Sequence, residues 1–230
     1  MKNWLGKALF LALLLAAGWQ VEKIARPVLG SAQLERPRLI LDAGHGGEDG
    51  GAVSRTGVPE SGINLSIVLK MDALLGLYGE EPVLVRDTNR SIHDQEAQTL
   101  RQKKNSDLKN RVKLVEETPN GVLLSIHQNI FTDPKFQGAQ VFFRPDPDSQ
   151  ALAGEMQEAL RQADPENRRK PAQIASTIYL MNHVTRPAVL VECGFLSHPV
   201  EEQKLLTGEY QTQLALCMTA AWLRWQQNWG

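Results

Sequence analysis

The chain has 230 residues, a formal net charge of −1 and 42% hydrophobic residues. This charge gives the molecule no overall field that would favour nucleic acid or an anionic membrane surface, so nothing in the composition indicates a nucleic-acid-binding protein. The two cysteines, Cys193 and Cys217, do not form a CxxC pair, which argues against a zinc site built from thiolates.

The N-terminal segment, residues 1–19, is predicted to direct export. Two lysines precede an apolar run at residues 8–19, which is the order of charge and hydrophobicity in a signal peptide. The run is shorter than the roughly 20 residues of a membrane span, but the pattern leaves open whether the segment is cleaved or stays as an anchor. A buried core helix is the alternative, which the terminal position and the lysines disfavour. Residues 20–37 read as a polar, proline-containing linker. We expect the domain at residues 38–230 to lie outside the cytoplasm.

From residue 38 onwards, apolar strands alternate with amphipathic helices. The expected elements, in chain order, are a strand at 38–42, a helix at 60–79, a strand at 82–86, a helix at 108–116, strands at 122–127 and 138–144, a helix at 149–163, strands at 177–181 and 188–193, and a helix at 211–225. Residues 89–104 are expected to form a loop or an exposed helical turn. This alternation predicts the α/β class, with one domain, a mostly parallel twisted sheet of about six strands, and helices on both faces.

Three potential metal ligands stand next to these elements. His45 follows the first strand inside a glycine-rich segment, Glu60 opens a helix, and His127 ends a later strand. Ligand sites gather at the carboxyl ends of parallel strands, and two imidazoles with one carboxylate leave an open position on a catalytic zinc ion. Other readings remain open, because a lone loop histidine is usually no ligand and a first-turn glutamate commonly complements the helix dipole.

Glu192 ends the very apolar strand that begins at Ala188. A carboxylate is costly to bury there without a partner, and this one is placed to take a proton from a metal-bound water. The alternative is a paired or solvated strand-end carboxylate. Cys193 follows on the same strand and should face the opposite side, in the core.

Four motifs carry a resemblance to a known family. They are residues 41–47 (LDAGHGG), Glu60 with Asn64 and Leu65, residues 125–129 (SIHQN) and residues 191–197 (VECGFLS). In order and context the chain resembles the N-acetylmuramoyl-L-alanine amidases of the type 3 zinc family over nearly all of residues 38–225. The departures are small: Ala43 replaces the usual proline and His198 the usual asparagine.

This resemblance implies an activity and a set of roles. The enzyme would hydrolyse the amide between the N-acetylmuramic acid lactyl group and the L-alanine of the peptidoglycan stem peptide. His45, Glu60 and His127 would hold one Zn²⁺, and Glu192 would be the catalytic acid and base.

A finer resemblance is to the germination-specific amidases of spore formers. It rests on residues 108–114 (LKNRVKL), 138–143 (GAQVFF) and 178–187 (IYLMNHVTRP), and it implies a role in spore cortex maturation, through muramic δ-lactam formation, and in germination. The short segment at 130–137 leaves no room for the blocking helix that division amidases of the family can carry. Control is therefore expected to come from expression, location or an activating protein partner.

Two further residues are weaker candidates for substrate contacts. Asn129 lies in the third motif, and Arg168 lies in a basic turn that would suit a substrate carboxylate but reads equally well as a solvated turn. His93 and His183 are expected to be a solvated and a loop histidine. Rival functions are a non-catalytic wall-binding relative, another zinc amide hydrolase and a structural partner in a wall or spore-coat complex. The presence of Glu192 beside three ligands disfavours the first.

Overall fold

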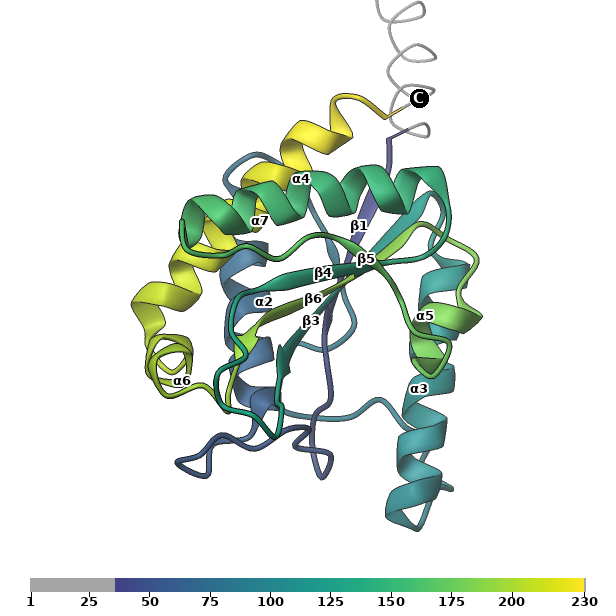
Figure 1. Ribbon diagram of the computed structural model, residues 1–230. Helices are drawn as coiled ribbons and strands as arrows, with labels where there is room; N and C mark the ends of the chain where they lie inside the picture. Colours follow the sequence, from purple (N-terminus) through teal and green to yellow (C-terminus); the bar gives the residue numbers. More distant parts are fainter. Residues whose placement is uncertain (1–35, 230) are drawn as a thin grey trace, which may run out of the picture. The chain divides into compact units, whose positions relative to one another are not determined.

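The computed structural model describes residues 36–229 (Figure 1). The expected signal segment at 1–19 and nearly all of the expected linker at 20–37 lie outside the described residues. Within the described range the chain forms one α/β domain, as predicted. No helix between residues 36 and 229 is both long enough and apolar enough to cross a membrane.

The sheet has six strands, and all but one pair of neighbours are parallel. The elements are β1 (Arg38–Ala43), α2 (Glu60–Gly76), β2 (Val83–Leu84), α3 (Leu100–Glu117), β3 (Gly121–Asn129), β4 (Gln140–Phe143), α4 (Pro147–Ala163), β5 (Ala172–Gln173), α5 (Tyr179–His183), β6 (Ala188–Phe195), α6 (Pro199–Leu205) and α7 (Gly208–Gln226). The strand order is β2-β1-β3-β6-β4-β5, and only β4 runs antiparallel to its neighbour β6.

The sequence predicted a strand at residues 177–181, and this prediction is wrong. The segment leads instead into the short helix α5, whose Leu180 and Met181 are buried against the sheet. The backbone amide of Asn182 donates to the carbonyl of Ile178, one turn earlier. With five residues, α5 is too short to display a helical period in the sequence.

Helix α3 begins earlier than expected. Thr99 accepts a hydrogen bond from the amide of Gln102, whose side chain reaches back to the Thr99 amide. This capping box extends the helix back to Leu100, because it satisfies amides that have no partner within the helix. The expected loop is therefore limited to the residues before Thr99.

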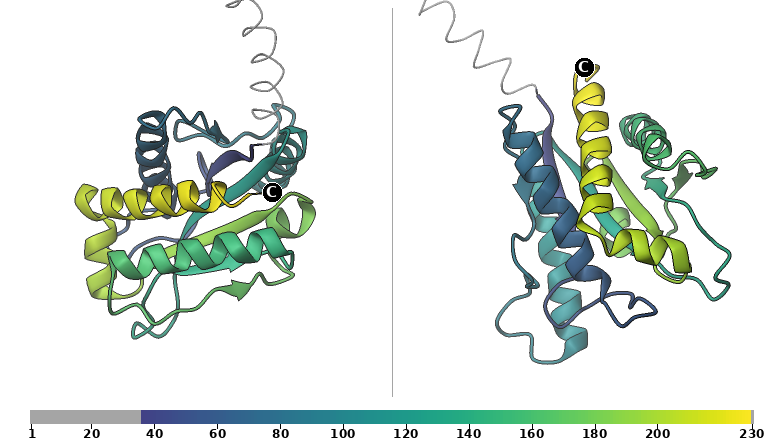
Figure 2. Two further views of the ribbon diagram at one scale, coloured as in Figure 1. Left: turned by 90° about the horizontal axis from the view of Figure 1, so that it is seen from above. Right: turned by 90° about the vertical axis from the view of Figure 1, so that its left-hand side faces the viewer.

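Helices cover both faces of the sheet, as predicted. Figure 2 shows α2, α7 and α4 side by side on one face, where Leu41, Leu124 and Val191 join their buried side chains. On the other face, Ile40 and Leu123 pack against α3 and α5. The central strands are thus apolar on both faces, which is the pattern of a parallel sheet covered by helices.

The face covered by α3 and α5 becomes polar towards the carboxyl ends of the strands. Residues two or four apart in a strand share a face. His127 therefore lies on the same face of β3 as Leu123, and Glu192 lies on the same face of β6 as Leu190. The backbone register aligns His127 with Glu192. On β1, Asp42 occupies this face. The apolar half of the face is packed by helices, and the polar half is left for the site.

Candidate metal centre and active site

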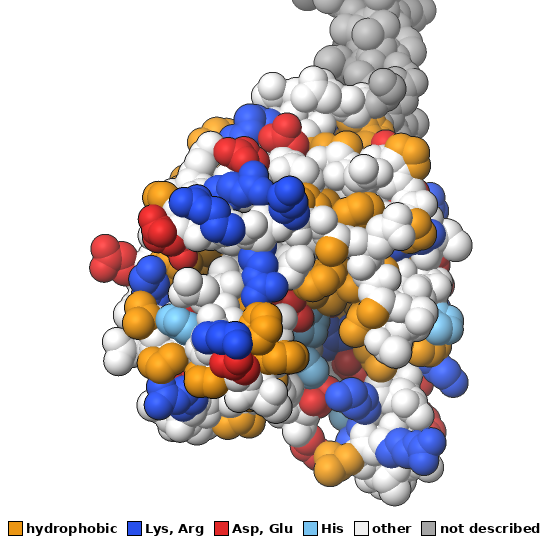
Figure 3. Space-filling view, in the orientation of Figure 1, with side chains coloured by type: hydrophobic (Ala, Val, Ile, Leu, Met, Phe, Trp, Pro, Cys, Tyr) orange, Lys and Arg blue, Asp and Glu red, His pale blue; other side chains and the backbone are white. Residues whose placement is uncertain are grey.

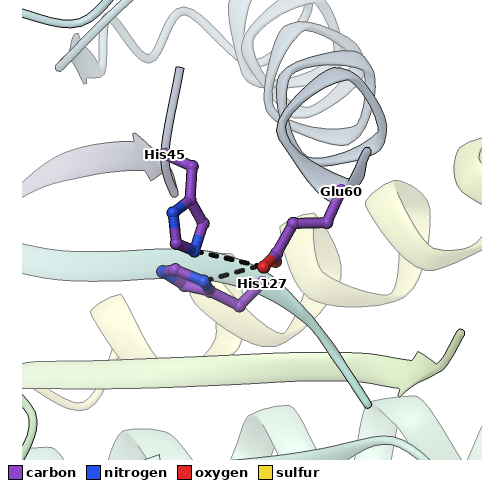
Figure 4. Close-up of side chains that lie close together, drawn as sticks. All are labelled: His45, Glu60 and His127. Atoms are coloured by element: carbon purple, nitrogen blue, oxygen red, sulfur yellow. Dashed lines mark ion pairs between the residues drawn. The ribbon is translucent and has the colours of Figure 1, made fainter. Parts of the chain in front are cut away.

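His45, Glu60 and His127 point toward one another at the carboxyl ends of β1 and β3 (Figure 4). One ligand atom from each lies within 4.8 Å of the others. His45 Nε2 is 3.1 Å from Glu60 Oε1, and His127 Nδ1 is 3.4 Å from Glu60 Oε2. The fold thus brings together three residues that are 15 or more positions apart in the chain.

The imidazole of His45 is oriented by a second carboxylate. Its Nδ1 lies 2.9 Å from Asp49 Oδ2, which leaves Nε2 to face Glu60. Metal-binding histidines are commonly held by such a carboxylate on the other ring nitrogen. Burial lowers the pKa of His45, but the hydrogen bonds to Asp49 and Glu60 outweigh it and raise the pKa to about 9. A positive charge, carried by a proton or a metal, is therefore favoured at the His45 imidazole, whose Nε2 faces Glu60.

Glu60 is held as a carboxylate by donors on both oxygens. Oε1 accepts from the amide of Ala52 at 2.7 Å, and Oε2 accepts from the amide of Gln128 at 2.9 Å and from Asn64 Nδ2 at 3.1 Å. Burial raises its pKa, but His127 and His45 outweigh burial and hold it well below the usual range. Two imidazole nitrogens and one ionised carboxylate form the donor set of a catalytic zinc site. The side chains present therefore fit such an ion.

Glu192 lies beside this set, on the neighbouring strand β6. Its Oε2 is buried and no described residue bonds to it. Burial raises the pKa of this carboxyl to about 7, although the nearby His127 opposes the rise. A carboxyl with this pKa gains and loses a proton near neutral pH, which is the property of a general acid and base.

A groove of about 480 Å³ opens over the four residues, and Figure 3 shows histidine side chains at the bottom of a hollow that is bordered in part by apolar side chains. Asn129 and Lys104 add polar groups to its lining, and Tyr179 and Leu190 add apolar surface. A groove of this kind admits a polar substrate that also carries apolar groups.

The structure separates the two weaker substrate candidates. Asn129 lines the groove, whereas Arg168 lies in another hollow with Asp164 and donates to the carbonyl of Pro165 at 2.8 Å. His183 is exposed, and its ring stacks on that of Tyr179, 3.8 Å away.

Sequence reasoning missed the buried charges beneath the metal ligands. Asp42, Arg86, Asp107 and Arg111 are all less than 8% exposed. Asp42 and Arg86 each directly follow a short apolar strand run, and that position is the one signal that could have identified them. Asp107 and Arg111 stand on a polar helix and resemble surface residues.

The mostly parallel sheet, this His–Glu–His set and the nearby carboxyl define an α/β protein with a candidate metal centre of the kind that hydrolytic zinc enzymes use. A family model described as N-acetylmuramoyl-L-alanine amidase matches residues 39–222. The chain belongs to this family and is a peptidoglycan amidase, which confirms the resemblance carried by the sequence motifs.

Individual relatives agree with this assignment. The chain is 32% identical over 188 residues to the germination-specific N-acetylmuramoyl-L-alanine amidase of Bacillus subtilis, covering 81% of this chain and 78% of the relative. Among solved structures, the CwlD amidase of Clostridioides difficile in complex with the GerS lipoprotein is 36% identical with a TM-score of 0.79, covering 84% of this chain and 99% of that one. An amidase from Clostridium difficile 630 is 27% identical with a TM-score of 0.73, covering 85% of this chain and all of that one.

Proposed function

We propose that this chain is a zinc-dependent amidase that separates the lactyl group of N-acetylmuramic acid from the L-alanine of the stem peptide. The observation that carries the proposal is the convergence of His45, Glu60 and His127 beside the carboxyl of Glu192, whose buried Oε2 has no hydrogen-bond partner among the described residues. His45, Glu60 and His127 would hold the zinc. When bound, zinc supplies a Lewis acid and a water that is acidic enough to act as a nucleophile near neutral pH.

Glu192 is the proposed acid and base. Its carboxylate takes the proton of the attacking water, and the carboxylic acid then gives that proton to the nitrogen of the leaving alanine. Glu60 stays ionised throughout, because its oxygens are held by Ala52, Asn64 and Gln128. Asn129 lines the groove, and it is the proposed contact to the substrate. The products are a glycan strand with a free lactyl carboxylate and a released stem peptide.

Metal analysis of purified variants tests the ligand set. The wild-type protein should bind one zinc, and His45→Ala or His127→Ala should abolish stoichiometric binding. His183→Ala is the matched control, because the exposed imidazole of His183 does not belong to the proposed ligand set. Tight zinc binding in both ligand variants would show the assignment to be wrong.

Product analysis tests the role of Glu192. Glu192→Gln keeps the size of the side chain but removes the base, which typically costs about 10²–10⁴ in rate. The variant should fold, bind zinc and release no stem peptide when intact peptidoglycan is incubated with it and muramidase digests are examined by mass spectrometry. Near-normal release would refute the role, and loss of zinc would make Glu192 a ligand.

We further propose that the amidase acts on spore cortex, in muramic δ-lactam formation. The similarity to the germination-specific relative supports this role. Expression in a spore-forming host that lacks its own germination-specific amidase should restore muramic δ-lactam to the cortex. If the lactam stays absent although the purified enzyme cleaves peptidoglycan, the role lies in another wall process.

Export and an activating protein partner complete the proposal. The N-terminal segment at 1–19 would direct the chain out of the cytoplasm or anchor it, with the linker at 20–37 before the catalytic domain at 38–230. A reporter fused after Ser31 should be active only outside the cytoplasm.

The similar CwlD amidase was solved with the GerS lipoprotein, which supports a partner here. Full zinc loading and activity of the isolated chain would argue against a required partner.

A further inference from the structure

The backbone of His45 has an unusual conformation. Its φ is +62°, and among the described residues only His45 and Asn120 combine a positive φ with a side chain. A non-glycine residue in the left-handed region is strained and persists where its surroundings impose that conformation. The conformation of this expected ligand therefore needs a structural cause.

Two buried arginines bind the carbonyl groups around His45. The carbonyl of Ala43 accepts from Arg86 Nε at 2.8 Å and from Arg111 Nη1 at 3.2 Å. The carbonyl of Gly44 accepts from Arg86 Nη2 at 3.0 Å, and the carbonyl of His45 accepts from Arg111 Nη2 at 2.9 Å. Three successive carbonyls thus point at two guanidinium groups. A rotation of the backbone out of the left-handed conformation would break these hydrogen bonds.

Arg111 is itself fixed by two carboxylates. It pairs with Asp42, and its Nε donates to Asp107 Oδ2 at 2.7 Å. Asp42 also accepts from the hydroxyl of Ser125 on β3 at 2.6 Å, and Asp107 accepts from the amide of Ile92 at 2.7 Å. The guanidinium therefore joins α3, β1, β3 and the loop before α3 to the backbone of His45.

Arg86 is held differently, because the acceptors within hydrogen-bonding distance of it are backbone carbonyls. Besides Ala43 and Gly44 these are Ser61 at 2.8 Å and Thr88 at 3.1 Å. Burial lowers the pKa of Arg86 to about 10, so it stays charged at neutral pH. A buried cation without a bonded carboxylate is costly. Arg86 offsets this cost by ordering the backbone on both sides of the site, at Ala43 and Gly44 and at Ser61.

We propose that Arg86 and Arg111 are positioning residues that hold His45 in the left-handed conformation from which its imidazole binds the metal. This inference rests on the proposed function, in which His45 is a zinc ligand. Arg111 acts through the carbonyl of His45, and Arg86 acts through the carbonyls of Ala43 and Gly44 directly before it.

Arginine-to-lysine variants test whether the site needs the arrangement of donors on the guanidinium or only its positive charge. Arg86→Lys and Arg111→Lys each keep one positive charge, but a single ammonium does not reproduce the fixed geometry of the guanidinium. We expect each variant to fold and to bind zinc about 10- to 100-fold more weakly, as is typical when outer partners of metal ligands are lost. Zinc affinity is measured by competition with a chelator, the absorption spectrum of the cobalt-substituted protein reports ligand geometry, and circular dichroism reports the fold.

Arg144→Lys is the matched control. Arg144 also donates to backbone carbonyls, those of Val184 and Arg186. Its own amide donates to the carbonyl of Ala188 at the amino end of β6, whereas the site lies at the carboxyl ends of the strands. This variant should bind zinc within about twofold of the wild-type protein. An equal loss of affinity in Arg144→Lys would mean that general destabilisation is the cause and would overturn the proposal.

The outcomes also distinguish this inference from the proposed function. If His45→Ala loses zinc but both lysine variants bind it as tightly as the wild-type protein, the positioning role is wrong and the ligand assignment stands. If His45→Ala retains zinc, the ligand assignment fails and the positioning role fails with it. If Arg111→Lys does not fold, Arg86→Lys decides the question, because it leaves the pairs of Arg111 with Asp42 and Asp107 intact.

Discussion

A Cβ atom on Gly44 would lie 2.2 Å from Cε1 of the His127 imidazole, so the backbone of Gly44 forms the surface against which this ring packs. Gly44→Ala should push the ring away from Glu60 and weaken zinc binding at least tenfold, because a catalytic zinc site depends on the position of each protein ligand. Zinc titration of the purified variant measures this effect.

Gly62→Ala is the control for that substitution. Gly62 lies within α2, and nothing lies within 4 Å of an added Cβ. Gly62 is the third residue of α2, where alanine is favoured over glycine by less than the roughly 0.5–1 kcal/mol of a helix interior. This variant should therefore melt at an equal or slightly higher temperature with unchanged zinc affinity. Equal zinc affinity in the two variants would show that the close approach of Gly44 to His127 is unimportant.

Asn129 and Arg168 should differ in their effect on catalysis. Asn129 lines the groove and Arg168 lies outside it. Loss of a polar contact with the substrate costs about 1–3 kcal/mol, so Asn129→Ala should lower kcat/KM on peptidoglycan by roughly 5- to 100-fold with zinc retained. Arg168→Ala should leave kcat/KM within about twofold. A large loss in Arg168→Ala alone would place substrate recognition at the second hollow.

The stability of the metal-free protein should depend on pH through Glu192. Burial raises the pKa of this carboxyl to about 7 in the folded state, from an ordinary 4.5. Between these values the folded state keeps a proton that the unfolded state releases, so the free energy of unfolding falls as pH rises. Below about pH 4.5 both states are protonated and nothing is lost. Above pH 7 the cost should be on the order of 1–3 kcal/mol.

Denaturant unfolding of chelator-treated protein measures this cost. Glu192→Gln has no titrating group at this position, so it should match the wild-type protein near pH 4.5 and exceed it in stability above pH 7. Zinc is removed because a bound cation would change the charge beside Glu192. A constant difference between the two proteins across this pH range would mean that the carboxyl is better solvated than its buried Oε2 implies.

The sequence alone determined the class of the fold and singled out the residues of the candidate centre. Apolar runs such as the one before Asp42 predicted the central strands, because a strand covered on both faces must be apolar throughout. Chemically distinctive motifs then singled out His45, Glu60, His127 and Glu192. Each is a polar residue next to a strong strand or helix signal. A polar residue in such an apolar setting can be recognised from the sequence alone.

The tertiary structure alone decided how those residues are held. Arg86 and Arg111, the buried residues that bind the carbonyls of residues 43–45, come from different parts of the chain. Arg111 stands on a helix whose composition is that of an exposed surface. Their role arises from the distances between carbonyls, guanidinium groups and carboxylates after the chain has folded. Strand register brings Glu192 level with His127, and residues of α3 and α5, among them Lys104 and Tyr179, line the groove at that end of the sheet. Sequence spacing does not encode such long-range contacts, because they depend on how separate elements pack together.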